Sequence, residues 1–421
     1  MEDLNNKTKA ELVKLCKERN IKGYSSRKKE DIIGMLEENT NNIKDKGQYF
    51  TKSEKLQEFI FDKAAHKGEC LLEPSFGAGH LLQKFKNYDD NYPIVCYELD
   101  ENIKPIIQFN DYQTAIYGDF LNLKIAKKFK TIIGNPPFVK QKSGNLYIKF
   151  VKKCYELLTD DGEILFIVPS DFIKLTSSTL IIEEMSKNGS FTDFFFPNDE
   201  NLFEGANIDV VVFRYEKGCK TNKTFVNGKE LYCNINNGII TFSETKASGY
   251  SIKDKFNVFV GMVSGRDNIY RNSLGNIDIL IDKDKLVKYI FTDTFPTEDA
   301  NINNYLLKYK TELINRRIKK FTEDNWFEWG APRNMSNIKS YWGKLCIYVK
   351  NMTRNKIIAF KGKVQYFNGS LLCIVPINDI KEDEIEKIID YMNSEPFQNN
   401  YIYSGRFKIG HKQLSSSIIP L

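Results

Sequence analysis

The sequence predicts an α/β protein built around a doubly wound, Rossmann-like parallel sheet. Strand patterns alternate with helix patterns through the middle of the chain, only helical periodicity precedes them, and the alternation becomes irregular afterwards. We therefore expect a small helical module at residues 1–39, an α/β domain at 44–217, a hairpin extension at 218–250 and an α+β domain at 251–421.

Composition bounds the class of protein. The chain has 421 residues, of which 41% are hydrophobic and 28% charged, as in soluble globular proteins. We find no apolar run long enough to span a bilayer and no signal-peptide pattern, so we expect a cytoplasmic protein without a membrane partner. The net charge of +6 is compatible with a nucleic-acid partner but does not require one.

Cysteine and histidine usage gives no sign of a metal centre. The eight cysteines are scattered without a C-x-x-C pair, and the three histidines are far apart in the sequence. We therefore predict buried thiols, no disulfide framework and no metal.

The first 39 residues predict two short helices. Thr8 and Glu11 have the spacing of a capping box, and the polar stretch 20–26 separates the two helices. The predicted apolar faces contain Leu12, Leu15 and Cys16 in the first helix, and Ile32, Met35 and Leu36 in the second.

Basic residues stand where the second helix begins. Lys28 and Lys29, with Arg27, lie next to backbone N–H groups that point out of a helix start, an arrangement that suits a phosphate. A solvated charged face is the alternative interpretation.

The elements of the α/β domain follow from apolar runs and helical spacing. Strands are predicted at residues 69–74, 93–100, 114–120, 129–138, 163–172, 191–196 and 208–218. Helices are predicted at residues 55–65, 79–85, 101–110, 146–158 and 182–189. Asn-Gly pairs within residues 224–242 predict a hairpin. Ligands of such sheets bind beyond the carboxyl ends of the strands.

Two predicted strands end in residues that suit a nucleoside cofactor. Gly77 and Gly79 allow a tight turn after the first strand, although no P-loop or complete G-x-G-x-x-G pattern is present. Glu98 follows about 20 residues later, where an acid accepts ribose hydroxyls. A structural turn and a solvated strand end are the alternatives.

The next two strand ends carry further candidates. Asp119 could accept from an adenine amine while Phe120 stacks on the ring, although a helix N-cap would also explain Asp119. Residues 135–138 read Asn-Pro-Pro-Phe at the end of a buried strand. Four such strand ends in this order are hard to explain by chance.

These motifs resemble class I S-adenosylmethionine-dependent methyltransferases, and most closely the gamma group of adenine-N6 DNA methyltransferases of restriction-modification systems. "GQYFTKSEKLQEFI" resembles the first cofactor motif, with Tyr49 and Thr51 beside the methionine end. "LEPSFGAG" resembles the motif whose acid, Glu73, faces the methionine amino group. The resemblance implies S-adenosyl-L-methionine as the cofactor, bound by Tyr49, Thr51, Glu73, Pro74, Ser75, Phe76, Gly77, Gly79, Glu98, Asp119 and Phe120.

The Asn-Pro-Pro-Phe motif supplies the catalytic candidates. Adenine N6 is a poor nucleophile because its lone pair is delocalised, so acceptors at both hydrogens would localise it. The Asn135 side-chain oxygen and the Pro136 carbonyl are those acceptors, Pro136 and Pro137 fix them, and Phe138 stacks on the flipped base. Phe203 resembles a second residue against that base, and a core position is equally compatible.

The remaining segments resemble DNA-binding parts. Residues 8–36 resemble a SAP helix-loop-helix module, and residues 251–421 resemble a target-recognition domain. Candidate DNA contacts are Lys28, Lys29, Arg266, Arg333, Arg354, Arg406 and Lys408, and ordinary surface charge is the alternative for each of them. Trp326, Trp329 and Trp342 are predicted core residues. We expect a monomer that acts on double-stranded DNA.

Two other functions remain open. Asn-Pro-Pro-aromatic motifs also occur in enzymes that methylate RNA bases or a protein glutamine amide, because any planar amine or amide poses the same chemical problem. A catalytically silent DNA-binding protein is the third possibility. The helical module and the large C-terminal domain favour DNA, and the lack of a Pro-Cys pair argues against cytosine-C5 chemistry. Cytosine-N4 enzymes use a related motif, more often with serine first, so Asn135 favours adenine without proving it.

Overall fold

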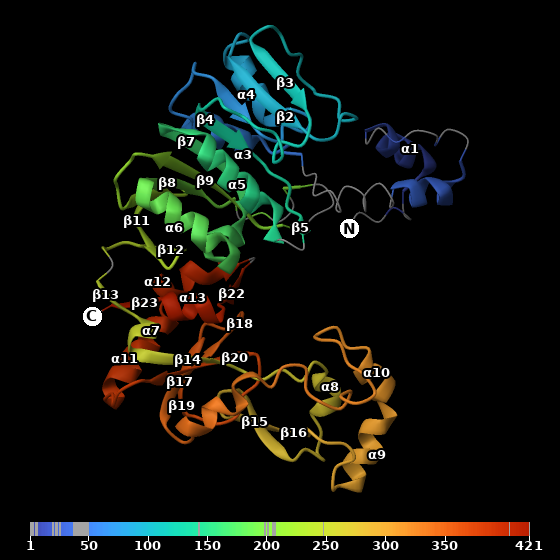
Figure 1. The fold of residues 1–421 in the computed structure, drawn as a ribbon, viewed down its shortest axis with the longest axis vertical. Helices are drawn as coiled ribbons and strands as arrows, with labels where there is room; N and C mark the ends of the chain where they lie inside the picture. Colours follow the sequence, from blue (N-terminus) through green and yellow to red (C-terminus); the bar gives the residue numbers. More distant parts are fainter. Residues whose placement is uncertain are drawn as a thin grey trace. The chain divides into compact units, whose positions relative to one another are not determined.

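The computed structural model divides the chain into two compact units, Met1–Thr245 and Lys246–Leu421 (Figure 1). We describe each unit by itself. The structure describes all residues except 1–3, 5–6, 19–20, 22–23, 25–26, 37–49, 142–143, 198, 200–201, 204–207, 247, 404 and 421.

The N-terminal helices agree with the capping prediction. Helix α1 (Lys9–Glu18) begins after Thr8, whose N–H and hydroxyl each donate to a Glu11 carboxylate oxygen at 2.7 Å. A second helix covers residues 29–36. Its buried side chains are those of Ile32, Ile33 and Leu36, whereas the predicted Met35 is only half-buried.

The first unit contains a ten-stranded sheet with the order β12-β11-β10-β8-β9-β7-β4-β1-β2-β3. Its strands are β1 (Leu71–Glu73), β2 (Ile94–Glu98), β3 (Gln113–Tyr117), β4 (Phe129–Gly134), β7 (Leu158–Pro169), β8 (Gly189–Phe195), β9 (Val210–Lys217), β10 (Lys223–Val226), β11 (Lys229–Asn236) and β12 (Ile239–Ser243). Strands β3, β2, β1, β4 and β7 are parallel neighbours, and β9 is antiparallel to both β7 and β8. This mixed α/β sheet, parallel for most of its strands, is typical of class I methyltransferases and confirms the predicted fold class.

The helices cover both faces of this sheet because its strands are apolar on both sides. Ile132 and Ile133 of β4 belong to different core clusters, and so do Leu165 and Phe166 of β7. One cluster contains side chains of α3 (Glu54–Lys63) and α4 (His80–Tyr88), and the other contains those of α5 (Leu146–Leu157) and α6 (Thr179–Asn188). The doubly wound arrangement follows from this alternation.

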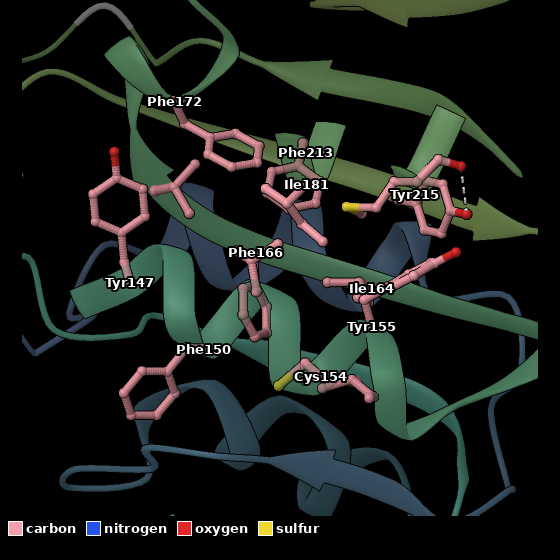
Figure 2. Close-up of a cluster of buried hydrophobic side chains, with 14 of the residues drawn as sticks. Tyr147, Phe150, Cys154, Tyr155, Ile164, Phe166, Phe172, Ile181, Phe213 and Tyr215 are labelled. Atoms are coloured by element: carbon pink, nitrogen blue, oxygen red, sulfur yellow. Dashed lines mark hydrogen bonds between the residues drawn. The ribbon is translucent and has the colours of Figure 1, made fainter. Parts of the chain in front are cut away.

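Aromatic side chains dominate the α5–α6 side of the sheet (Figure 2). Phe172 stacks on Phe213 with ring centroids 5.1 Å apart, and Tyr155 meets Tyr215 edge-on at 5.9 Å. The Tyr215 hydroxyl donates to the Met185 carbonyl at 2.9 Å, so this buried polar group is satisfied.

Strands β10 to β12 extend the same sheet through two tight hairpins. Both turns are Asn-Gly pairs with positive φ at both residues, 47° and 83° at Asn227-Gly228 and 49° and 69° at Asn237-Gly238. This is the type I′ geometry that Asn-Gly favours. The predicted hairpin region therefore contributes strands to the central sheet.

The helix predicted at residues 101–110 is wrong. These residues form turns and irregular chain, since Pro105 lacks a donor and disfavours a helical residue before it. The Ile106 N–H donates to the Ala78 carbonyl at 2.9 Å, which anchors this segment on the turn after β1.

A buried ion pair joins several elements of the sheet. Glu163 of β7 is fully buried and accepts from Arg214 Nε at 2.7 Å and from Thr131 Oγ1 at 3.0 Å. The backbone N–H groups of Ala65 and His66, just after α3, donate to the same carboxylate at 2.8 and 3.2 Å. Strands β4, β7 and β9 and the end of α3 are thus fixed by one group.

The second unit contains a four-stranded antiparallel sheet, β14-β20-β17-β19, and smaller sheets β13-β23, β15-β16 and β18-β22-β21. The strands are β13 (Gly249–Ser251), β14 (Phe256–Val260), β15 (Ile277–Asp282), β16 (Lys285–Tyr289), β17 (Leu345–Lys350), β18 (Met352–Thr353), β19 (Ala359–Lys363), β20 (Leu371–Pro376), β21 (Ile402–Tyr403), β22 (Arg406–Lys408) and β23 (Ile418–Pro420). The α-helices are α7 (Ile252–Lys255), α8 (Asp267–Tyr270), α9 (Ala300–Lys308), α10 (Lys310–Ile314), α11 (Glu382–Asn393), α12 (Glu395–Gln398) and α13 (His411–Ser416).

The tryptophan prediction is correct for two residues of this unit. Trp326 and Trp329 are buried, but Trp342 is 52% exposed and packs edge-on against Tyr366, so its prediction as a core residue is wrong. All eight cysteines are free thiols. Within the described part of the chain, no His, Cys, Asp and Glu cluster could hold a metal ion, and no helix has the length and apolarity to cross a membrane.

The Glu163 interactions make a stability prediction. Glu163→Gln removes the buried charge of this pair, while half-buried Arg214 keeps Glu216 and Asp193 as partners, so we expect the free energy of unfolding to fall by about 1–3 kcal/mol. Urea unfolding of the full chain measures this. Glu230→Gln, in an exposed ion pair with Lys223, is the matched control and should change stability far less. Equal effects of the two substitutions would contradict this account.

Candidate functional site

A cavity lies at the carboxyl ends of the parallel strands of the first unit. Its volume is about 1310 Å³, above the range of about 300–1,000 Å³ usual for a small-molecule site. Its lining comes from the turns after β1, β2, β3 and β4 and from one side of α5. The four strand ends singled out from the sequence therefore meet at one cavity.

Glu98 is fixed at the end of β2 by two turns. Its Oε2 accepts from the Gly77 N–H at 2.9 Å, and its Oε1 accepts from the Asp100 N–H at 3.0 Å. Glu98 is 8% exposed and lines the cavity. Each carboxylate oxygen has a second lone pair, so Glu98 can still accept from a diol.

The turn after β1 brings backbone close to the cavity. Gly77 has φ +53°, and a Cβ there would lie 3.2 Å from Cδ1 of Phe50, which also lines the cavity. Pro74 and Ser75 line the cavity as well, whereas Gly79 begins α4 and packs against Ile107.

A buried acid lies beside this turn. Burial raises the pKa of the Glu73 carboxyl well above its ordinary value, and the charge of Glu98 raises it further. Glu73 Oε2 and Ser75 Oγ are buried without a hydrogen-bond partner among the described residues. Such orphaned polar atoms fit a ligand that brings an ammonium or other donor, as S-adenosylmethionine would.

The turn after β3 contains the predicted adenine residues. Asp119 lines the cavity, and its Oδ1 and Oδ2 accept from the Leu121 N–H at 3.0 Å and from Asn122 Nδ2 at 2.6 Å. Phe120 also lines the cavity, although it is only 2% exposed, and it stacks on Phe150.

Asn135 follows β4 directly and lines the cavity, and its side-chain oxygen is buried. Its Nδ2 donates to Thr51 Oγ1 at 3.0 Å, which fixes the plane of the amide. Pro137 lines the cavity, and Pro136 is buried. Two consecutive prolines leave this backbone little freedom.

Phe138 is held between two aromatic rings. Tyr147 lies 6.2 Å away at 86°, and Phe203 lies 6.1 Å away at 84°. Phe203, which the sequence assigned to either a base pocket or the core, is thus both 2% exposed and in contact with Phe138.

Several predicted site residues lie elsewhere. Phe76 is buried and packs edge-on against Phe109 and Tyr117, so only its backbone is near the cavity-lining turn. Tyr49 lies outside the described residues. Neither Lys28 nor Lys29 lines this cavity.

The basic candidates for DNA contact have differing surroundings. Asp31 accepts from the Lys28 N–H at 3.3 Å, so an acid already occupies part of that helix start. Arg266 is exposed but paired with Glu312 at 3.3 Å. Arg406 is exposed in β22, with its guanidinium 3.9 Å from the Met352 sulfur.

Sequence reasoning missed three residues of the site. Phe50 lines the cavity, Tyr147 orients Phe138, and Lys153 contacts the turn after β3. Tyr147 and Lys153 face the site because α5 follows the Asn-Pro-Pro-Phe segment closely. The spacing of 147, 150 and 153 on one helix face was the available signal.

The fold and these strand-end residues define a class I methyltransferase architecture. Residues 26–203 match the family model of the Eco57I restriction-modification methylase. This region, less than half of the chain, is therefore similar to Eco57I-type restriction-modification methylases, a family that implies S-adenosylmethionine as co-substrate. Residues 3–42 match the family model of the N-terminal domain of the Rho termination factor, whereas a SAP module was expected there from the sequence.

Two relatives illustrate the range of similar proteins. The type II methyltransferase M.HincII of Haemophilus influenzae is 26% identical over 195 residues, covering 41% of this chain and 37% of that protein. The chain thus spans well under half the length of this relative. The release factor glutamine methyltransferase of Buchnera aphidicola subsp. Acyrthosiphon pisum is 32% identical over 108 residues, covering 24% of this chain and 37% of that protein.

One solved structure resembles nearly the whole chain. The type IIL restriction-modification enzyme MmeI, solved in complex with DNA, has a TM-score of 0.52 and covers 97% of this chain and 67% of that chain. Its sequence identity is 12%, so the similarity concerns the fold alone.

The Gly77 geometry predicts an effect of adding one methyl group. Gly77→Ala places a side chain on a left-handed backbone, which should lower the free energy of unfolding by about 1–2 kcal/mol. The contact of the new Cβ with Phe50 should lower it further. Gly228→Ala is the control, since φ is +83° and the space around it is open. Urea unfolding should rank Gly77→Ala as the more destabilising, and a loss no larger than that of the control would contradict the contact.

Proposed function

We propose that this chain is a DNA methyltransferase that transfers a methyl group from S-adenosylmethionine to N6 of an adenine flipped out of duplex DNA. The observation that carries the proposal is the position of Asn135 and Pro137 in the same cavity as Glu98 and Asp119. Those four residues come from three strand ends, so the proposed methyl donor and acceptor would share one cavity.

The proposed cofactor residues accept hydrogen bonds from the cofactor or leave room for it. Glu98 would accept hydrogen bonds from the ribose hydroxyls, and Asp119 would accept one from the adenine amine. Glu73 would accept one from the amino group at the methionine end. Gly77 permits close approach of the backbone. The bound cofactor supplies an electrophilic methyl group on a sulfonium.

The proposed catalytic residues prepare the amine. Asn135 Nδ2 donates to Thr51 Oγ1, and the buried oxygen of the same amide would accept one N6 hydrogen. The Pro136 carbonyl would accept the other. Both acceptors are fixed before the reaction, which favours the pyramidal nitrogen in the transition state.

Phe138 would stack on the extruded base. Its flanking rings, Tyr147 and Phe203, meet it nearly perpendicularly, so the orientation of its face is set by packing. A prearranged stacking surface offsets part of the free energy of unstacking a base.

The C-terminal unit carries a candidate DNA surface in the sheet β18-β22-β21. Residues 351–358 and 398–413 include exposed Arg354, Lys356 and Arg406 and contain no Asp or Glu. Met352 and Ile402 of the same sheet are 53% and 43% exposed. Basic side chains with interspersed apolar ones suit a nucleic-acid backbone and its grooves. The N-terminal module would add a second, SAP-like contact through Lys28 and Lys29.

A second candidate function is methylation of an RNA base or a glutamine amide. The similarity to a release factor glutamine methyltransferase supports it, because an amide nitrogen poses the same problem of a delocalised lone pair. One assay separates the two. Purified protein is incubated with methyl-tritiated S-adenosylmethionine and duplex DNA, tRNA, rRNA or release factor. N6-methyladenine in DNA is expected, and label only in RNA or protein would overturn the proposal.

Asn135→Ala should lower the rate of methyl transfer by roughly 100-fold or more, because one of two preorganised acceptors is lost. The affinity for S-adenosylhomocysteine, measured by calorimetry, should stay within a few-fold. Asn145→Ala, at the start of α5, is the control and should retain activity. Full activity of Asn135→Ala would refute the proposed chemistry.

The β18-β22-β21 surface predicts salt-dependent DNA binding. Arg354→Gln with Arg406→Gln should weaken duplex binding and reduce the slope of log affinity against log salt by about 2, one unit for each phosphate contact. Lys283→Gln with Lys285→Gln is the control pair, since Lys283 lies in the turn after β15 and Lys285 begins β16, both beside the acids Asp282 and Asp284. An unchanged slope in the Arg354–Arg406 variant would place the phosphate contacts elsewhere.

A further inference from the structure

Lys153 of α5 closes over the turn that contains Asp119 and Phe120. Its Nζ donates to the carbonyl oxygens of Leu121 at 3.1 Å and Leu123 at 2.6 Å, and also to that of Phe120. These three carbonyls belong to four consecutive residues, so one ammonium group ties together a short segment that the Asp119 carboxylate holds from its other end.

These contacts occupy the whole donor capacity of the side chain. A lysine ammonium has three N–H donors and no acceptor, and three carbonyls receive them. Lys153 lines the cavity, yet it has no donor left for a bound molecule. Its contribution to binding therefore passes through the turn and not through direct contact.

A second residue of α5 supports the same turn. Phe150 stacks on Phe120 with centroids 5.5 Å apart and an interplanar angle of 17°. The Lys153 ammonium also lies 4.8 Å from the centre of the Phe120 ring, and Tyr97 meets the ring at 5.3 Å. Phe120 is thus enclosed by α5 and β2, and the neighbouring Asp119 carboxylate is placed at the cavity.

The environment of Lys153 fits a structural cation. Burial lowers the pKa of Lys153, while the nearby charges of Asp119 and Glu156 oppose that shift. A partly desolvated ammonium bonded to three carbonyls gains more from each bond than an exposed one. Replacing it would leave three carbonyls to find other partners, and the turn would lose its defined shape.

We propose that Lys153 is a positioning residue for the purine end of the cofactor, acting by fixing residues 119–123. This inference rests on the proposed function, since it takes the cofactor's adenine to lie against Asp119 and Phe120. The competing interpretation is that Lys153 only stabilises the fold.

Binding of two ligands tests the proposal. Lys153→Met should weaken both S-adenosylhomocysteine and 5′-methylthioadenosine by about tenfold in calorimetry. The factor should be the same for both, because 5′-methylthioadenosine has the purine and ribose but lacks the amino-acid end. Lys153→Arg keeps a positive charge and several N–H donors, so it should bind both ligands more tightly than Lys153→Met does. Lys187→Met, an exposed lysine of α6, is the matched control and should bind both ligands as the unchanged chain does.

Kinetics separate positioning from general damage. KM for S-adenosylmethionine should rise in Lys153→Met while kcat at saturating cofactor stays within about twofold. Unchanged affinity for both ligands in a folded Lys153→Met would overturn the proposal, and so would a loss confined to S-adenosylhomocysteine. Failure of the unchanged chain to bind either ligand would overturn the proposed cofactor site itself, whatever the variants do.

Discussion

The buried carboxylate of Glu163 is the interaction on which the geometry of the first unit depends. It is compensated by Arg214 and by donors from two other elements, so it is satisfied only when β4, β7 and β9 lie in one register. A shift of any strand by one residue would leave a charge buried without its partner, and would also turn every apolar side chain to the opposite face. Register in turn decides where β4 ends, and hence where Asn135 lies.

Helix α5, which packs on this sheet, positions two parts of the proposed site. Tyr147, Phe150 and Lys153 follow each other at intervals of three residues, so they share one face of a rigid element. Tyr147 contacts Phe138 of the proposed base pocket, whereas Phe150 and Lys153 contact the turn of the proposed adenine pocket. A single helix therefore sets the spacing between the two halves of the cavity. Tyr147 and Phe150 also belong to the hydrophobic core on this side of the sheet, so the same contacts serve both the packing of the sheet and the proposed site.

The sequence predicted those parts of the structure that local chemistry determines. Apolar runs located the strands, the Thr8–Glu11 spacing located a helix start, and Asn-Gly pairs located turns. The helix at residues 101–110 was mispredicted because its apolar spacing was given more weight than Pro105. Trp342 was mispredicted because large apolar residues are usually buried, and its exposure depends on tertiary packing. Lys153 was missed for the same reason, since its partners are carbonyls whose positions are set by a distant turn.

The proposed choice of substrate depends on features outside the Asn-Pro-Pro-Phe segment. Adenine N6 and a glutamine amide are both planar and both carry a delocalised lone pair. Both would donate to the same two oxygen acceptors and could stack on the same aromatic face. Chemistry at Asn135 thus cannot distinguish them. A nucleic-acid backbone, however, carries a negative charge at every unit, and the exposed β18-β22-β21 surface with its acid-free flanking segments favours such a partner over an average polypeptide. The preference for nucleic acid over protein therefore rests on the second unit, while the chemistry of transfer rests on the first.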